Sequence, residues 1–542
     1  MLTGPDYLVI SVYLLATVGV GVGIGLRMKS GSDYFLGGRQ LPWWAIGMSL
    51  VATDIGGTDI IGVGGAAYTH GMAVANFEWI GCVPAMIVGA FVFIPFFYRA
   101  GVYTIPEFLE RRYNAGVRTI VAICWLAFMA CNLGIMLLAS AKMMSALFSW
   151  NQSACILVTA ALVGAYTLFG GLAAVVYTDM IQCAVMVAGC LLILVLGLVE
   201  VGGISELRQR IAAGSNEVKQ AGVADAVDGD NGINGTNGVD AARSRMSLIL
   251  PVDTPSPFPW PGIYFGLALI LSPAYWIGNQ AIVQRSLGAR SEFEAKASYI
   301  WGALLKNLIP VIVAVPGLIA LALLPDLADG DAAIPSLVGR LLPTGLRGLF
   351  VAAFLAALMS SVDSYLNSAA TIFSNDIYRR YIRPELTDRQ LLGVGRVTTT
   401  VLVVWAVGFA YLLATMPEGS GIYAIFQTLM AFFQGPTFAV LLIGILWPRA
   451  TGRAALIALL GGIATAVGLY ALNHPGVCRT LGVEPLFRIQ EPFLYFSVWA
   501  FAVTCALLVG LSHLGPGNTP EQLACTLRGD SRRSSASAET GP

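Results

Sequence analysis

The sequence predicts an all-α integral membrane protein of about thirteen transmembrane helices with two groups of five at its core. Hydrophobic residues make up 56% of the 542 residues and charged residues only 11%, and the mean hydropathy is +0.74. These values lie far outside the range of soluble globular domains. Apolar runs long enough to cross a hydrocarbon layer of ~30 Å recur along the chain. Helix breakers interrupt the first run of each group of five at corresponding places.

The candidate transmembrane spans follow directly from the apolar runs. They cover residues 6–26, 41–69, 74–98, 119–148, 153–169, 175–200, 260–284, 297–324, 347–377, 391–414, 420–447, 453–472 and 493–513. Some turns between spans are short, such as the one around Asn151, so that neighbouring spans can merge.

The basic residues predict the orientation of the chain. If the N-terminus is external, most of the 31 Lys and Arg fall in inward loops and in the tail, and Arg285 is counted among them. The short outward loops contain only Arg340, Arg347, Arg479 and Arg488. This asymmetry predicts an odd number of spans and a cytoplasmic C-terminus. The first run follows Asp6 rather than a basic region and has no small-residue cleavage site, so we expect a retained helix.

Six parts are expected along the chain. They are an N-terminal helix with an inner loop (1–40), a first five-helix repeat (41–200), an external and partly disordered loop (201–259), a second five-helix repeat (260–447), C-terminal helices (448–513) and a cytoplasmic tail (514–542). The centre of the loop, D-G-D-N-G-I-N-G-T-N-G, has Asp228 and Asp230, but Gly232 takes the third ligand position of a calcium loop and no Glu follows at the required distance. A flexible loop is therefore favoured over a calcium site.

The breakers indicate a transporter. Ile55-Gly56-Gly57 interrupts the first span of one group, and Ser272-Pro273 and Gly278-Asn279 interrupt the first span of the other. Paired interruptions of this kind are typical of inverted-repeat transporters, whose unwound segments face a water-accessible cavity at mid-membrane. In such a cavity Asp54 and Asp59 avoid much of the ~2.5–3.5 kcal/mol that a carboxylate costs inside a bilayer.

Few polar residues lie within the spans, and each is a functional hypothesis by default. The set comprises Asp54, Asp59, Glu78, Lys142, Asp179, Lys306, Asp363 and Gln427, with Ser360, Ser361 and Ser364 nearby. Structural alternatives remain open, because Lys142 can snorkel from the outer end of its helix, Asp179 can be interfacial, and serines also pack helices closely. The serine and aspartate oxygens at 356–364 suit a small alkali cation better than a transition metal.

Longer blocks resemble the sodium/solute symporter family, particularly its sodium/glucose cotransporter branch. These blocks are A-T-D-I-G, F-E-W and A-G-V-Y-T-I-P-E-F-L-E-R-R-Y within 52–113, G-G-L-A-A-V-V-Y-T-D-M-I-Q at 170–182, N-Q-A-I-V-Q-R at 279–285, and L-M-S-S-V-D-S-Y-L-N-S-A-A-T-I-F-S-N-D-I-Y at 358–378. The resemblance extends from residue 5 to residue 450 and implies a LeuT-like core of five plus five helices and sodium-driven uptake.

The resemblance also implies cation sites. The sodium site would use the carbonyls of Ala52, Ile55 and Ala357 and the hydroxyls of Ser360 and Ser361. A possible second sodium site would use Asp179, Asp363 and Ser364. Asp363 departs from the Ser or Thr that is usual in the family, and a carboxylate there can strengthen cation binding or carry a proton instead.

At the family's sugar-binding positions, five residues of this chain are similar to the family's and two differ from them. The similar positions are Glu78, Tyr275, Trp276, Lys306 and Gln427, whereas Asp54 replaces the usual Asn and Asp59 a position that is often His or Gln. Carboxylates accept hydrogen bonds from sugar hydroxyls, an amide both donates and accepts, and an aromatic face covers a pyranose. A sugar or polyol is therefore favoured, with a cationic or zwitterionic solute as the alternative.

We therefore expect a Na+-coupled secondary active symporter in the plasma membrane, whose partners are the solute and the lipid bilayer, with no nucleic acid and no obligate protein partner. A channel would need a continuous polar pore, and the three His, nine Cys and the Ser residues form no catalytic set. Two structural alternatives concern Asp54 and Asp59: Asp54 is protonated and hydrogen-bonded to a neighbouring helix, or Asp59 pairs with Lys306 only for packing.

Overall fold

The computed structural model describes residues 3–25, 31–148, 150–220, 245–254, 256–415, 422–487, 492–527 and 529. In the first half of the chain the helices are α1 (Gly4–Gly25), α2 (Gly31–Leu36), η1 (Gly37–Arg39), α3 (Trp43–Asp54), α4 (Gly57–His70), η2 (Met72–Phe77), α5 (Val83–Val88), η3 (Gly89–Phe93), α6 (Ile94–Ala100), α7 (Ile105–Arg112), α8 (Ala115–Phe148), α9 (Gln152–Val201) and α10 (Ile204–Gln220).

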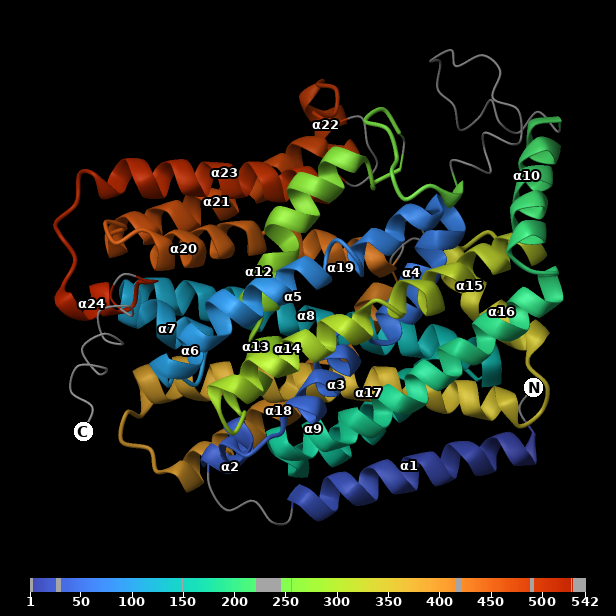
Figure 1. The fold of residues 1–542 in the computed structure, drawn as a ribbon, viewed down its shortest axis with the longest axis horizontal. Helices are drawn as coiled ribbons and strands as arrows, with labels where there is room; N and C mark the ends of the chain where they lie inside the picture. Colours follow the sequence, from blue (N-terminus) through green and yellow to red (C-terminus); the bar gives the residue numbers. More distant parts are fainter. Residues whose placement is uncertain are drawn as a thin grey trace.

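In the second half they are η5 (Gly262–Leu271), α12 (Ser272–Gly278), α13 (Gln280–Leu287), α14 (Glu292–Lys306), α15 (Ile309–Leu323), η6 (Gly330–Ala332), α16 (Ala333–Leu341), α17 (Leu346–Ile372), η7 (Phe373–Ile382), α18 (Asp388–Ala414), α19 (Ile422–Ala431), α20 (Gln434–Leu446), α21 (Gly452–Asn473), α22 (Pro475–Leu481), α23 (Phe493–Ser512) and α24 (Pro520–Ala524). Figure 1 shows most of these helices running along the long axis of the molecule.

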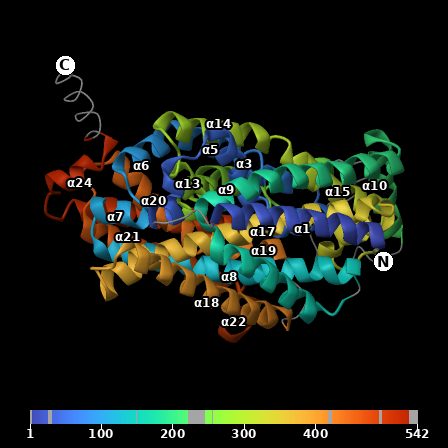
Figure 2. The same cartoon turned by 90° about the horizontal axis from the view of Figure 1, so that it is seen from below.

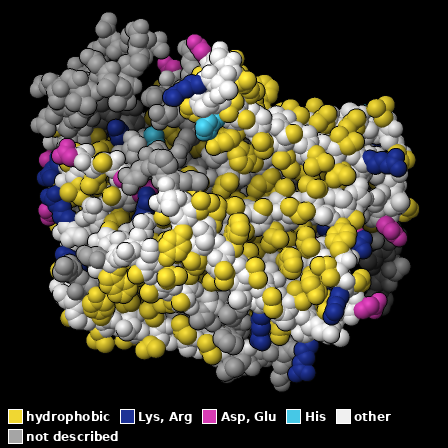
Figure 3. Space-filling model, turned by 180° about the vertical axis from the view of Figure 1, so that it is seen from behind, with side chains coloured by type: hydrophobic (Ala, Val, Ile, Leu, Met, Phe, Trp, Pro, Cys, Tyr) yellow, Lys and Arg dark blue, Asp and Glu magenta, His cyan; other side chains and the backbone are white. Residues whose placement is uncertain are grey.

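The helices form a multi-pass membrane bundle. Within the described residues nine helical segments are long and apolar enough to cross a membrane, and three bent pairs bring the number to as many as twelve. The count reaches the predicted thirteen only if the shorter apolar helix Gln152–Gly164 is added. Figure 3 shows apolar side chains across the middle of one face, with most charged side chains toward the two ends. Such a belt matches the hydrocarbon layer of a bilayer.

The long helix α9 contains two spans rather than one. At 1.5 Å per residue a straight helix of its 50 residues would be about 75 Å long, more than twice the hydrocarbon thickness. Gly171, with φ 56° and ψ 177°, breaks the helical path at a conformation that favours glycine. The first residues of α9 follow the end of α8, whose Lys142 pairs with Asp329, and Gly197 near the other end packs on Ile319. Both ends therefore lie near the connection that follows α15, and the chain reverses between them, as predicted.

The first span of each repeat is bent in its middle. α3 and α4 meet at 55° across Ile55 and Gly56, and η5–α12 meets α13 at 50° across Asn279. The break predicted at Ser272-Pro273 is wrong, because η5 continues into α12 there. The helix continues through the proline, and the wider π turn of η5, in which the Ser272 N–H donates to the Leu267 carbonyl, directly precedes it. A third bend of 41°, between α19 and α20, was not predicted.

α17 forms the centre of the bundle, with 94% of its span window buried. It packs along α9 and α8, and α1 lies against both α9 and α17 (Figure 2). Asp6 fixes the start of α1, because its Oδ1 accepts hydrogen bonds from the N–H groups of Gly345 and Gly348 at 2.7 and 2.8 Å, where α17 begins. α1 is thus attached to the N-terminal end of α17, the helix that contains the predicted sodium-binding serines.

The insertion expected as a loop begins with a helix. α10 lies across one end of the bundle against α9 and α15 (Figure 1), and its buried residues include Leu207 and Ile211. Its apolar residues recur at helical spacing among charged ones, a pattern that the low hydropathy of the insertion concealed. The low-complexity centre lies outside the described residues.

α1 begins at the end where α10 lies and α24 lies at the opposite end (Figure 1). The six-part division of the chain stays a prediction.

Candidate substrate and cation site

The break between α3 and α4 exposes backbone carbonyls to the hydroxyls of α17. The Gly56 N–H donates to Asp59 Oδ2 at 2.8 Å and so leaves the helical ladder. Ser360 Oγ lies 2.7 Å from the Ala52 carbonyl oxygen and 2.9 Å from that of Ala357. All these groups are buried except Asp59, which is partly exposed. An unwound helix next to hydroxyls provides the hard oxygen donors that a sodium ion requires.

The remaining predicted sodium ligands lie at the same break. Ser361 Oγ donates to the Thr53 carbonyl at 2.9 Å and sits against Gly56, where an added Cβ would come within 2.8 Å of it. Ile55 follows α3 with φ −94° and ψ 89°, so its carbonyl departs from the helical direction. The structure therefore brings all five predicted positions to one place, although the Ser361 hydroxyl contacts Thr53 rather than the predicted carbonyls.

A cavity of about 60 Å³ lies beside this break. Its lining includes six of the seven predicted substrate residues, which are Asp54, Asp59, Glu78, Tyr275, Trp276 and Gln427. The residues come from α3, α4, α12, α19 and the turn before α5, so both bent spans contribute. Tyr275 also reaches α17, with its hydroxyl 3.3 Å from that of Tyr365. The cavity is smaller than the ~300–1,000 Å³ of typical ligand pockets, so a sugar-sized solute requires its walls to move apart.

Lys306, the seventh predicted residue, lies behind the cavity wall. It is fully buried at the end of α14 and forms ion pairs with both Asp54 and Glu78. Its ammonium also lies 5.8 Å from the ring centroid of Trp276. A buried lysine between two carboxylates compensates charges that neither could retain alone inside a membrane. The alternative in which Asp59 pairs with Lys306 for packing is wrong, because Lys306 pairs with Asp54 and Glu78 instead.

Asp59 has a different environment from the other two carboxylates. Its Oδ2 accepts hydrogen bonds from the Gly56 N–H at 2.8 Å and from Thr58 Oγ1 at 3.4 Å, which caps the first turn of α4. A carboxylate is favoured there because the N–H groups and the dipole of a helix point toward its N-terminus. Asp59 forms no ion pair with any described residue, and it still lines the cavity.

The predicted second sodium site is divided by an arginine. Asp179 Oδ2 accepts from Ser49 Oγ at 2.6 Å and from Arg285 Nη2 at 3.3 Å, and all three residues are buried. The same Nη2 donates to Ser364 Oγ, which in turn lies 3.2 Å from Asp363 Oδ1. A guanidinium therefore stands between the acid and the hydroxyl that were expected to share a cation.

Two other features of the bundle lie apart from this site. An apolar groove of 810 Å³ between α8, η7 and α18 includes Ile123, Val397 and Trp405 and has no charged residue among its described lining, so it does not suit a polar solute. Lys142 does not simply snorkel, because it forms ion pairs with Asp331 at 3.1 Å and Asp329 at 3.3 Å.

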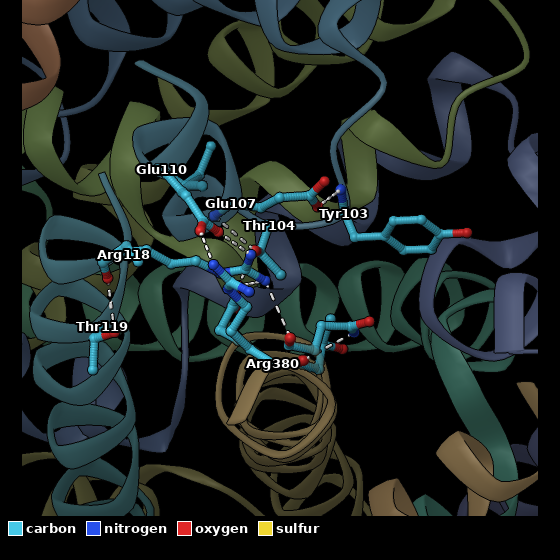
Figure 4. Close-up of polar contacts among 12 residues, drawn as sticks. Tyr103, Thr104, Glu107, Glu110, Arg118, Thr119 and Arg380 are labelled. Atoms are coloured by element: carbon cyan, nitrogen blue, oxygen red, sulfur yellow. Dashed lines mark hydrogen bonds and ion pairs between the residues drawn. The ribbon is translucent and has the colours of Figure 1, made fainter. Parts of the chain in front are cut away.

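An ion-pair network joins α7 and α8 to η7 (Figure 4). Arg118 contacts Glu110 at 2.5 Å and Asp376 at 2.7 Å, Thr104 Oγ1 donates to Asp376 at 2.9 Å, and Arg380 contacts Glu110 at 2.7 Å. Partial burial alone would raise the pKa of Glu110, but the hydrogen bonds and charges of the two arginines outweigh it and lower that pKa below its usual value. The network fixes three segments relative to one another at the end where α7 lies.

Comparison with known proteins identifies the family. The model of the Sodium:solute symporter family matches residues 34–462, which is most of the chain. The chain belongs to the sodium:solute symporter family. Among similar proteins, a sodium/glucose cotransporter of Vibrio parahaemolyticus is 33% identical over 86% of this chain and 84% of its own length. A sodium/myo-inositol cotransporter of Bos taurus is 31% identical over 96% of this chain and 75% of its own length.

Solved structures support the same fold for this symporter. The substrate-bound outward-open state of a Na+-coupled sialic acid symporter superposes with a TM-score of 0.75 at 22% identity, covering 95% of this chain and 99% of that chain. The all-α membrane fold with a LeuT-like core is therefore confirmed. The roles assigned to individual site residues stay predictions.

Sequence reasoning missed several polar residues that the fold of this symporter brings to the site. Arg285 was counted as an inward loop residue, yet it is 1% exposed within α13. Its place six residues after the breaker at Asn279, still within the bent span, was the available signal. Gln434 also lines the cavity, and both of its side-chain polar atoms lack a hydrogen-bond partner among the described residues. It follows the bend between α19 and α20, which the sequence did not reveal.

Proposed function

We propose that the protein is a Na+-coupled secondary active symporter that imports a sugar or polyol by alternating access. The coupling ion binds at Ala52, Ile55, Ala357, Ser360 and Ser361, and the solute binds in the cavity lined by Asp54, Asp59, Glu78, Tyr275, Trp276 and Gln427. The relatives named above transport glucose or myo-inositol with sodium, which supports a polyhydroxylated solute here.

The observation that carries this proposal is the break between α3 and α4, which contributes to both the predicted sodium site and the solute cavity. Ser360 Oγ contacts the Ala52 carbonyl on one side of it, and Asp54, two residues later, faces the cavity. A cation bound to Ala52 and Ser360 would join α3 to α17 and thereby fix the position of Asp54. Coupling then follows, because the cation and the solute stabilise the same arrangement of one unwound segment.

The contents of the cavity suit a neutral polyol. Asp54 and Glu78 share Lys306, and each carboxylate retains acceptor capacity for a solute hydroxyl. Tyr275 on α12 and Gln427 on α19 supply an aromatic face and an amide to the cavity lining. Because the cavity is contracted, solute entry requires movement of α12 and α19 relative to α3 and α4. Such movement about bent helices is how alternating access proceeds in inverted-repeat transporters.

A solute that bears an amino group is the second candidate. Asp59 is the one carboxylate of the cavity without a basic partner among the described residues, and it could pair with a cationic substituent. Competition by a protonated amino sugar, compared with its neutral parent, distinguishes the two solute classes. Loss of amino-sugar selectivity in Asp59→Asn would support this candidate, and equal competition by the neutral parent in the unmodified protein would exclude it.

The charge asymmetry and the course of the chain support the orientation that we propose for the protein. We assign the protein to the plasma membrane, with the N-terminus outside and the C-terminus in the cytoplasm. The start of α1 and α24 lie at opposite ends of the bundle (Figure 1), which agrees with an odd number of crossings. Solute, sodium and lipid are the partners that this function requires.

Uptake into proteoliposomes tests the proposal. Purified full-length protein is reconstituted, and accumulation of labelled glucose, galactose, mannose and myo-inositol is measured with an inward sodium gradient, with an equal potassium gradient and with no gradient. We expect accumulation above equilibrium only with sodium, and loss of this sodium dependence in Ser361→Ala. Uptake that merely equilibrates, or that proceeds equally in potassium, would reject the symporter assignment.

A further inference from the structure

The apolar groove between α8, η7 and α18 lies outside the transport site. Its volume of 810 Å³ far exceeds the 60 Å³ of the solute cavity. Figure 2 shows α8 and α18 together at one edge of the bundle. Four of the lining side chains are each at least 48% exposed, namely Ile123, Val397, Val401 and Trp405. The groove therefore opens toward the surrounding lipid rather than into the core.

Small residues contribute to the hollow. Ala127 and Ala130 on α8 and Gly393 on α18 belong to its lining, and an added Cβ at Gly393 would meet no atom within 4 Å. The aromatic side chains of Phe373 and Tyr378 on η7 line another part of it. An unfilled void loses the contacts that close packing provides. An apolar guest in this groove is therefore buried without displacing a side chain.

The groove has the length of a lipid chain. Gly393, Val397, Val401 and Trp405 recur at four-residue spacing, and we call them the groove stripe of α18. At 1.5 Å per residue the groove stripe is about 18 Å long, slightly more than half of the ~30 Å hydrocarbon thickness. An acyl chain of one leaflet matches this length, whereas a transmembrane helix of a partner would continue across both leaflets.

A positive charge precedes the groove stripe. Arg389 lies four residues before Gly393, in the first turn of α18. Side chains of a helix tilt toward its N-terminus, so that Arg389 extends away from the groove toward the headgroup layer. It is exposed and forms no hydrogen bond or ion pair with another described residue. Its guanidinium is therefore available to an anion at the membrane surface.

The segment around Arg389 is basic. Residues 377–396 contain five arginines against two acidic residues, a net charge of +3, and of the five only Arg380 forms an ion pair with a described residue, Glu110. Thr119 of α8 and Tyr381 of η7 add a hydrogen-bonded pair of hydroxyls. Guanidinium and hydroxyl groups suit a phosphate. This is the end where α7 lies, which is cytoplasmic in the proposed orientation, and the anionic lipids of the cytoplasmic leaflet attract basic segments.

We propose that the groove binds one anionic phospholipid of the cytoplasmic leaflet, with an acyl chain along the groove stripe and the phosphate at Arg389. The lipid would contact α8, α18 and η7 together. η7 continues α17, which contains Ser360 and Ser361 of the predicted sodium site, so the lipid would brace the helix that carries those serines. This inference goes beyond the proposed function and holds for any transported solute.

Lipid binding to the purified full-length protein tests the inference. Native mass spectrometry in detergent counts the bound lipids, with dioleoyl phosphatidylglycerol and dioleoyl phosphatidylcholine as the probes. The two lipids have the same acyl chains, but only the first has a net negative charge. We expect wild type to bind one phosphatidylglycerol at least about tenfold more tightly than phosphatidylcholine, because several unpaired arginines each favour the anionic headgroup.

Two variants separate the acyl chain from the headgroup. Gly393→Leu fills the groove and should weaken binding of both lipids at least about tenfold. Gly408→Leu is its matched control, because Gly408 is also exposed on α18, with no atom within 4 Å of an added Cβ, but lies outside the lining. Arg389→Gln should weaken only phosphatidylglycerol binding, about fivefold. Arg453→Gln is its matched control, because Arg453 is the exposed second residue of α21 as Arg389 is of α18. Both controls should bind as wild type does.

Three outcomes would overturn the inference. They are the absence of a bound lipid in wild type, equal binding of the two lipids by wild type, and unchanged binding in Gly393→Leu. A wild-type dimer that Gly393→Leu abolishes, with no lipid retained, would assign the groove to a second copy of the chain and would equally overturn it. None of these outcomes bears on sodium-driven uptake, which tests the proposed function. If gel filtration and circular dichroism show that Gly393→Leu fails to fold, Val397→Trp, at an exposed position of the groove stripe, provides the same test.

Discussion

Replacing Asp59 by Asn separates solute recognition from sodium binding. In the structure, Asp59 Oδ2 accepts from the Gly56 N–H at 2.8 Å while the side chain lines the cavity. The Asn oxygen can keep the bond to Gly56, so α4 retains its cap. What changes is the second oxygen, which becomes an amide NH2 that can no longer accept a hydrogen bond from a solute hydroxyl.

The expected size of the effect follows from this one bond. A hydrogen bond to a charged group contributes about 1.5–3 kcal/mol, and loss of a single bond from solute to Asp59 therefore raises KM about 10- to 150-fold. The cap loses only part of its strength, about 1 kcal/mol, because a neutral acceptor is weaker than a carboxylate. Sodium half-saturation should change by less than about twofold, since Ser360 and Ser361 bond to Ala52 and Thr53 on α3.

Concentration series of solute and sodium in proteoliposomes provide the assay, with Ser361→Ala as the reciprocal variant. Ser361→Ala removes a predicted sodium ligand and should weaken sodium dependence while leaving the cavity side chains in place. Asp59→Asn protein that folds in lower yield but keeps its KM and its solute selectivity would refute the reasoning. Asp59 would then be only a helix cap.

Three further predictions concern groups around the site. Lys306→Gln leaves Asp54 and Glu78 buried without their shared cation, and we expect it to cost about 3–5 kcal/mol of stability, measured by thermal unfolding in detergent, unless Asp54→Asn is added to relieve the charge. Asp6→Ala leaves two backbone N–H groups at the start of α17 unpaired and should cost about 2–6 kcal/mol, whereas Asp6→Asn should cost less; equal melting temperatures would contradict this. Glu110→Gln tests a pH dependence. Because the folded-state pKa of Glu110 is lowered, its ion pairs contribute fully above the unfolded-state pKa of ~4.3 and are lost as pH falls through the lower folded-state value, so the difference in melting temperature from wild type should disappear in acid.

Much of the fold could be predicted because membrane spans obey local rules. Hydrocarbon thickness requires long apolar helices, and every backbone N–H and C=O in lipid must be bonded within its own segment. The breakers at Gly56 and Asn279 therefore marked the bent spans. The rule failed at Pro273, where a π turn accommodates the proline, and at the bend between α19 and α20.

The sequence by itself determined most of the polar residues that lie within the spans, because their placement depends on the surrounding apolar run, but it assigned Arg285 to a loop. The pairing of those residues was decided by the tertiary structure. Lys306 is shared by Asp54 and Glu78 rather than paired with Asp59, and Arg285 takes the place expected for a cation beside Asp179. Periodicity fixes the depth of a side chain but not which distant helix it faces, and Coulomb interactions at low dielectric depend on that separation. These partners are far apart in the chain and meet only when the two repeats and α1 pack together.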